Sequence, residues 1–140
     1  MIEKALLEEA KFDATQRELL HITWRMLHAI HTGDIETYKE LSTPDLSCFE
    51  DVCAYRIDGV DFHLSLMRQM LENPALAPRR FDIVSPRVQV YGETGIVTYT
   101  RLMTFDVQGS PVWKTYNETR VYVRQGGAWR MAHFHRSPTS

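Results

Sequence analysis

The chain has 140 residues, with 16 lysine and arginine residues against 18 aspartate and glutamate residues and a formal net charge of −2. Hydrophobic residues make up 44% and charged residues 24%, as in one ordinary globular domain, and the chain is too short for a second domain of usual size. No basic run concentrates positive charge, which argues against nucleic acid as a partner. No apolar run approaches the roughly 18 residues of a membrane span. The acidic residues in 1–9 are unlike a signal peptide, so we expect no membrane partner and a cytoplasmic location.

The first third of the chain has the spacing of helices. Residues 1–14 are helix-prone and charged, and they form either an extended first helix or a tail. Apolar residues at three- and four-residue intervals predict a helix over 15–32: Leu19, Leu20, Trp24, Leu27 and Ile30. Gly33 is a stop signal, and Asp34 is an N-cap for a second helix over 35–41.

The rest of the chain changes from helical to strand periodicity. We expect a turn at 43–45, a short strand over 46–50, an irregular segment or hairpin over 51–60, and a helix over 62–71 capped by Asp61. Beyond it, alternation predicts strands over 87–91, 96–107, 113–124 and 129–136, joined by short turns as an antiparallel meander. Helices first and sheet last make an α+β fold, with the helices on one face of the sheet.

Several short motifs follow one another in a recognisable order. They are Gly-Val-Asp-Phe-His at 59–63, Tyr-Thr-Arg-Leu at 99–102, Asn-Glu-Thr-Arg-Val at 117–121, Gly-Ala-Trp at 127–129 and His-Phe-His-Arg-Ser at 133–137. Upstream, Thr-Gly-Asp at 32–34, Tyr38 and Cys-Phe-Glu at 48–50 continue the series. Over residues 15–138 this order resembles the association (hub) domain of calcium/calmodulin-dependent protein kinase II.

The resemblance implies a fold and a role. The fold is the cone of the nuclear-transport-factor-2 (NTF2)-like superfamily, which includes SnoaL-like and ketosteroid-isomerase-like proteins: a curved antiparallel sheet wraps an N-terminal helix and leaves a pocket. In the kinase, this domain assembles subunits into rings. A kinase domain does not fit in 140 residues, so we expect residues 1–140 to be a single, free-standing relative that forms at least a homodimer.

Three arginines lie in the meander, at positions where alternation gives each of them aromatic or apolar neighbours on the same face. Arg101 shares its face with Tyr99, Arg120 with Glu118 and Tyr122, and Arg136 with Phe134 and Ala132. If these faces form one concave surface, three guanidinium groups converge in an apolar cavity, where burial of unpaired cations is costly.

Acids or a bound anion must balance this charge. Glu118 neutralises one arginine and Glu50 is a second candidate, and the remaining positive charge favours a small carboxylate, which matches the guanidinium fork. The resemblance implies the same kind of ligand, because the residues that face it in the family match His63, Arg101, Arg120 and Arg136. We expect no cofactor.

Two other interpretations of these residues stay open. The arginines and acids can form a closed salt-bridge network with no ligand. Alternatively, the chain is an enzyme of the isomerase, dehydratase or cyclase type, in which Glu118, beside Tyr99 or Tyr122, or His63 acts as general base. Arginine close to Glu118 lowers the pKa of a carboxyl group, which weakens it as a base.

The opposite face of the sheet is the expected subunit interface. Its candidates share one phase of alternation on the last two strands: Trp113, Val121, Val123, Trp129, Met131, His133 and His135. A metal site of His63, His133 and His135 is a weaker alternative, and we expect no metal, because alternation points His133 and His135 away from the pocket. Cys48 and Cys53 are expected to be free thiols, and His28 and His31 to lie on a partly exposed face of the first helix.

Overall fold

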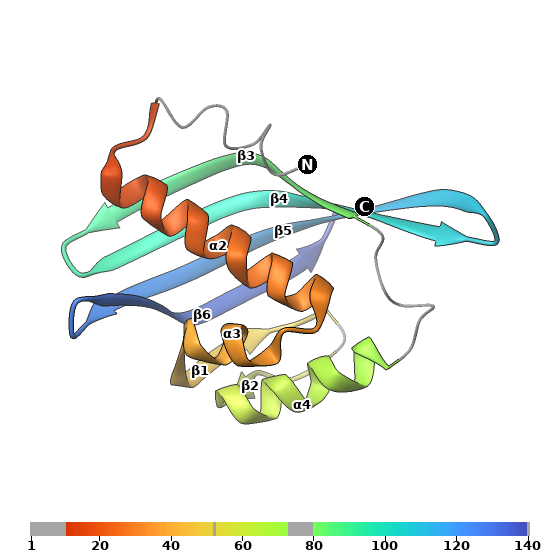
Figure 1. Ribbon diagram of the computed structural model, residues 1–140, viewed down its shortest axis with the longest axis horizontal. Helices are drawn as coiled ribbons and strands as arrows, with labels where there is room; N and C mark the ends of the chain where they lie inside the picture. Colours follow the sequence, from red (N-terminus) through yellow and green to blue (C-terminus); the bar gives the residue numbers. More distant parts are fainter. Residues whose placement is uncertain (1–10, 52, 73–79, 140) are drawn as a thin grey trace.

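Figure 1 shows the computed structural model, which describes residues 11–51, 53–72 and 80–139. Most of the expected extension or tail, residues 1–10, lies outside this range. The elements follow in the order α2 (Ala14–Thr32), α3 (Ile35–Glu40), β1 (Ser42–Phe49), β2 (Ile57–Asp58), α4 (Val60–Leu71), β3 (Arg80–Tyr91), β4 (Thr94–Val107), β5 (Ser110–Gln125) and β6 (Ala128–Pro138). The expected α+β fold is confirmed.

One six-stranded mixed sheet runs in the order β2-β1-β6-β5-β4-β3. Strands β3 to β6 form the expected antiparallel meander, and β1 adds to β6 in parallel. Helix α2 lies across the face of the meander, and α3 and α4 lie beside β1 and β2 (Figure 1). The helices therefore cover one face of the sheet, and the described elements leave the other face open.

Helix α2 is defined at both ends by its sequence. Asp13 accepts a hydrogen bond from the Gln16 amide, and the Gln16 side chain accepts one from the Asp13 amide, which makes a capping box. Gly33 ends the helix with a φ of 75°, a left-handed conformation that glycine adopts without strain. The buried stripe between these ends packs on the sheet: Leu19, Leu20, Ile22, Met26, Leu27 and Ala29.

Two local predictions upstream of the meander are wrong. Residues 43–45 belong to β1 and form no turn, because the strand begins at Ser42, which pairs with Met131; the pairing shifts before Ser47, and this irregular stretch accommodates Pro44. Helix α4 begins at Val60 directly after Gly59, so Asp61 lies in its first turn and is not its cap.

A β-bulge in β6 reverses which side of the sheet the side chains in the first half of that strand face. Val121 pairs with His133, but Tyr122 pairs with Met131, so Ala132 is the extra residue. Beyond the bulge, Trp129 and Met131 are buried in the core, so the prediction that they lie in the interface is wrong. Ala132 likewise does not keep the phase of Phe134 and Arg136.

The hairpin of β4 and β5 extends beyond the body of the sheet (Figure 1). Its exposed apolar residues are Val107, Val112 and Trp113. Trp113 is 60% exposed there and lies on this arm instead of over the centre of the outward face. Cys48 and Cys53 are free thiols, as expected. Within the described residues, no helix is both long and apolar enough to span a membrane.

We predict that Gly95→Ala destabilises the fold by about 1–3 kcal/mol, the usual cost of overpacking a core. A Cβ atom at this buried position in β4 would collide with Cδ1 of Leu19, which is fully buried in α2. Denaturant unfolding at fixed protein concentration measures the cost. In a Leu19→Ala background the same substitution should cost less, and an equal cost in both backgrounds would show that the collision is not the reason.

Candidate functional site

The centre of the site is an ion cluster on the inner face of β4 and β5. Tyr99 pairs with Glu118 across the two strands, and alternation places Arg101 and Arg120 on the same face. All four side chains are buried; Arg101 is 3% exposed and Arg120 1%. The convergence of Arg101 and Arg120 inside the protein was predicted from alternation alone.

One carboxylate serves both arginines. Glu118 Oε1 accepts hydrogen bonds from the Tyr99 hydroxyl at 2.6 Å and from Arg120 Nη2 at 3.3 Å. Glu118 Oε2 lies 2.9 Å from Arg101 Nε. Arg120 Nε in turn donates to the Tyr99 hydroxyl oxygen at 2.8 Å. Two cations therefore share a single negative charge at this point of the interior.

Glu118 is ionised in this environment. Burial alone would raise the pKa of its carboxyl group, but Arg101, Arg120 and the hydrogen bond from Tyr99 outweigh burial and hold the pKa below its usual range. Burial raises the pKa of the Tyr99 hydroxyl far above its usual range, so the tyrosine stays protonated and donates. This pair stabilises charge and is a poor proton acceptor.

Arg136 anchors a second part of the site at the end of β6. Its Nε donates to Asp51 Oδ1 at 3.0 Å, its Nη2 lies 3.0 Å from Glu50 Oε2, and its guanidinium carbon lies 4.6 Å from the centre of the Tyr116 ring. Burial raises the pKa of Glu50, with Arg136 opposing the rise. The sequence analysis anticipated Glu50 but missed Asp51; its only signal is its place directly after the Phe49-Glu50 motif.

His63 and Tyr122 lie at the two sides of this cluster. The His63 ring lies between Tyr38, whose hydroxyl is 3.2 Å from Nε2, and Cys48, whose sulfur is 3.7 Å from Nδ1. Burial, with help from Arg120 and Arg136, lowers the pKa of His63 to about 4, so the ring is neutral. The Tyr122 hydroxyl bonds to Thr23 at 2.6 Å, and no hydrogen bond joins it to Glu118 or Arg120.

His31 lies closer to the cluster than its sequence position suggested. Its ring contacts Phe81 of β3, with centroids 4.5 Å apart, and burial together with the charge of Arg101 lowers its pKa to about 4. We predicted a partly exposed helix face, and the side chain is half-buried. The last turn of α2 therefore presents this imidazole toward the arginines.

Three nitrogens around Arg101 are buried and have no hydrogen-bond partner. They are Arg101 Nε, Arg101 Nη1 and His31 Nε2. The contact of Arg101 with Glu118 is an ion pair without hydrogen-bond geometry, so it leaves both arginine nitrogens unbonded. Buried donors are nearly always paired, so these three nitrogens are exceptions among the described residues.

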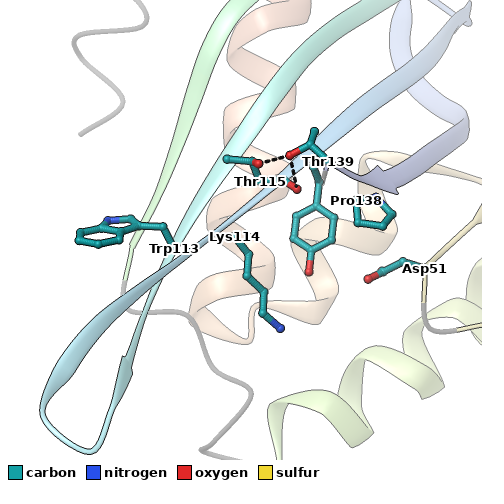
Figure 2. Close-up of a pocket in the computed structure, with 7 residues that line it drawn as sticks. Asp51, Trp113, Lys114, Thr115, Pro138 and Thr139 are labelled. Carbon is teal, nitrogen blue, oxygen red and sulfur yellow. Dashed lines mark hydrogen bonds between the residues drawn. The ribbon is translucent and has the colours of Figure 1, made fainter.

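An open pocket of about 420 Å³ lies at the β5 and β6 side of Asp51, and Figure 2 draws the residues that line it. It is lined by Asp51, Trp113, Lys114, Thr115, Tyr116, Pro138 and Thr139. Figure 2 shows Lys114 and Asp51 on two sides of this space, with Trp113 projecting away from them. Two of these lining residues, Asp51 and Tyr116, contact Arg136.

The outward face of the sheet carries a different set of side chains. His133 Nδ1 lies 2.8 Å from Ser47 Oγ, and the Phe49 ring, which is 40% exposed, lies 5.3 Å from the ring of His135 and 6.0 Å from that of His133. His63 is on the inner side, so the three histidines do not meet as metal ligands. No group of three metal-ligating side chains occurs among residues 11–51, 53–72 and 80–139.

Comparison with known proteins identifies the family. The family model of the calcium/calmodulin-dependent protein kinase II association domain matches residues 15–140. The chain belongs to this family. It is 32% identical over 134 residues to the delta subunit of calcium/calmodulin-dependent protein kinase type II from Oryctolagus cuniculus, covering 94% of this chain and 25% of the relative. The association domain thus spans about a quarter of that protein.

Solved hub structures agree with this assignment. The hub of the S. rosetta kinase superposes with a TM-score of 0.82 at 29% identity, covering 91% of this chain and 98% of that one. The hub homology domain of C. reinhardtii superposes with a TM-score of 0.80 at 32% identity, covering 91% and 100%. Two proteins of the NTF2-like family, from Cytophaga hutchinsonii and Streptomyces avermitilis, share the fold alone, at 16% and 22% identity and TM-scores of 0.72 and 0.77.

The buried neutral histidines make the stability of this association domain depend on pH. The pKa of His63 is about 4 in the folded domain, against roughly 6.5 in an unfolded chain. The folded domain therefore binds fewer protons between these values, and stability is lost as the pH falls through them, by about 3 kcal/mol for His63 alone.

We predict that His63→Gln makes the free energy of unfolding depend less on pH, even if the substitution also lowers stability at neutral pH. The measurement is the free energy of urea unfolding from about pH 7.5 to 4.5 at fixed protein concentration. His28→Gln, on an exposed helix face, is the matched control and should keep the slope of the unmodified domain. A slope unchanged by His63→Gln would mean that this imidazole is not neutral in the folded domain.

Proposed function

We propose that this chain is a non-catalytic, self-associating domain whose arginine-lined interior binds a small carboxylate. Membership of a family of association domains supports self-association, with a second copy as the partner. The outward face supplies the surface, because its half-buried and exposed side chains include Phe49, Val121, Val123, His133 and His135. An identical subunit is the simplest cover for such a face.

One observation carries the ligand part of the proposal. The Arg101 side chain is 3% exposed, yet its Nη1 has no hydrogen-bond partner. An arginine cannot lose its proton to escape burial, so an acceptor at this nitrogen is strongly favoured. A carboxylate supplies that acceptor and also the negative charge that Arg101 now shares with Arg120.

A ligand carboxylate would compete for the arginines with the acidic side chains that already contact them. Three arginines face three carboxyl groups, those of Glu50, Asp51 and Glu118. The cluster is neutral only when all three are ionised, and burial raises the pKa of Glu50, which shifts the balance toward positive charge. Asp51 contacts Arg136 and also lines the 420 Å³ pocket.

The alternative of catalysis finds less support in the same geometry. A general base at neutral pH needs a pKa near 7. The arginines hold the pKa of Glu118 below its usual range, and burial lowers that of His63 to about 4. Both groups are therefore weak bases, and the site is better suited to hold an anion than to abstract a proton.

The interface proposal predicts that Val121→Glu separates the subunits. The carboxylate would lie on the outward face and be buried unpaired between two copies, at a cost of several kcal/mol. Sedimentation velocity reports the mass, and Tyr91→Glu, at an exposed position at the end of β3, is the control that should leave it unchanged. An assembly that survives Val121→Glu would place the interface elsewhere.

The ligand proposal predicts that Arg101→Lys weakens carboxylate binding about tenfold or more without dispersing the assembly. Lysine keeps the positive charge beside Glu118 but loses the guanidinium fork, which accounts for a charge-assisted hydrogen bond of about 1.5–3 kcal/mol. Isothermal titration calorimetry with sodium butyrate measures affinity, and Arg87→Lys, on the exposed side of β3, is the control. Equal affinity in both variants would refute the pocket assignment.

A further inference from the structure

We propose that His31 is a ligand-contacting residue, and that one carboxylate bridges Arg101 Nη1 and His31 Nε2. This inference rests on the proposed carboxylate site and assigns to it a residue on α2. The two nitrogens share three properties: each is buried, each has no hydrogen-bond partner, and the two groups are close enough for the charge of Arg101 to act on the imidazole.

The ring of His31 is held in place by its packing. Phe81 of β3 lies 4.5 Å from it, centroid to centroid, and α2 ends two residues later at Gly33. The side chain therefore has little freedom to turn its Nε2 toward solvent. A nitrogen fixed in a buried position without a partner is costly, and a guest that accepts or donates there removes the cost.

The positive charge of the arginines favours a carboxylate over a water molecule as the bound species. Arg101 and Arg120 share the charge of Glu118. Burial raises the pKa of Glu50, the other acid that interacts with Arg101, so the cluster favours added negative charge. A water would satisfy the hydrogen bonds but not the charge. A carboxylate does both, with one oxygen accepting from Arg101 Nη1 and the other from a protonated His31 Nε2.

Binding of an anion is then coupled to uptake of a proton from solvent. The groups that act on His31 are His28 on its own helix, Arg101 on β4 and Glu118 on β5, while Phe81 of β3 contributes no charge. Without ligand, burial and Arg101 keep the ring neutral, with a pKa of about 4. A carboxylate placed against the ring opposes both effects, so affinity should rise as the pH falls from about 7.5 to 5.5.

Two variants distinguish the contribution of the His31 hydrogen bond to binding from the contribution of its protonation. His31→Leu removes both and should weaken butyrate binding about tenfold, as expected for one charge-assisted hydrogen bond. His31→Gln keeps a neutral donor, so it should bind within a few-fold of the original domain but without pH dependence. His21→Gln, on the exposed side of α2 and not among the groups that act on His31, is the matched control and should change neither property.

The experiment is calorimetric titration of the whole chain with sodium butyrate in two cationic buffers of different ionisation enthalpy, which gives the number of protons taken up. Cationic buffers avoid competition for the arginines. We expect proton uptake in the original domain and in His21→Gln, and none in His31→Leu or His31→Gln. Uptake that persists in His31→Leu would belong to another group, such as Glu50, and would overturn the inference.

Failure of this inference differs from failure of the proposed function. If the original domain binds butyrate and Arg101→Lys weakens binding, but His31→Leu has the original affinity, the site exists and His31 is not part of it. If the assembled original domain binds no butyrate at all between pH 5.5 and 7.5, the carboxylate site itself is wrong and the inference falls with it.

Discussion

The shared carboxylate of Glu118 is the constraint on which the interior of this domain depends. Two arginines that cannot lose their charge are buried on neighbouring strands, and Glu118 lies within 2.9 Å of one and 3.3 Å of the other. Removal of one partner from such a cluster leaves a buried charge uncompensated, at a cost of about 3–5 kcal/mol. Two constraints therefore determine the register of β4 against β5. One is the alternation of apolar side chains, and the other is the need to place Tyr99 opposite Glu118.

The same cluster determines the protonation of the groups around it. Positive charge holds Glu118 ionised and adds to burial in keeping His31 and His63 neutral. The interior thus contains a deprotonated acid, two uncharged imidazoles and one arginine, Arg101, with two unbonded nitrogens. Proton transfer at neutral pH needs groups poised near neutrality, whereas recognition of an anion needs fixed donors and positive charge. This is why the proposed anion site finds more support here than a general base does.

The sequence predicted those parts of the site that depend only on local periodicity. Alternation in β4 and β5 placed Arg101, Glu118 and Arg120 on one face, which is buried in the structure. The turns between the four strands lie close to their predicted positions, but β3 begins at Arg80, seven residues before the predicted start at 87. The facing of Trp129 and Met131 could not be predicted, because a one-residue bulge at Ala132 reverses the phase within β6 and leaves no mark in the sequence. Asp51 was missed for a similar reason: a loop residue after β1 reaches Arg136 only through the parallel pairing of β1 with β6, and the two residues are 85 positions apart in the sequence.

The bulge also explains how one strand serves two surfaces. On the inner side of β6, Phe134 lies 4.9 Å from the guanidinium of Arg120 and 5.2 Å from the ring of His63. On the outer side, the flanking residues His133 and His135 contact Phe49. Because Ala132 absorbs the change of phase, Met131 can also point inward and accept the contact of Arg120 Nη1 at 3.0 Å. Without the extra residue, Trp129 and Met131 would share the outward phase of His133 and His135, so the bulge is what returns the first half of β6 to the core.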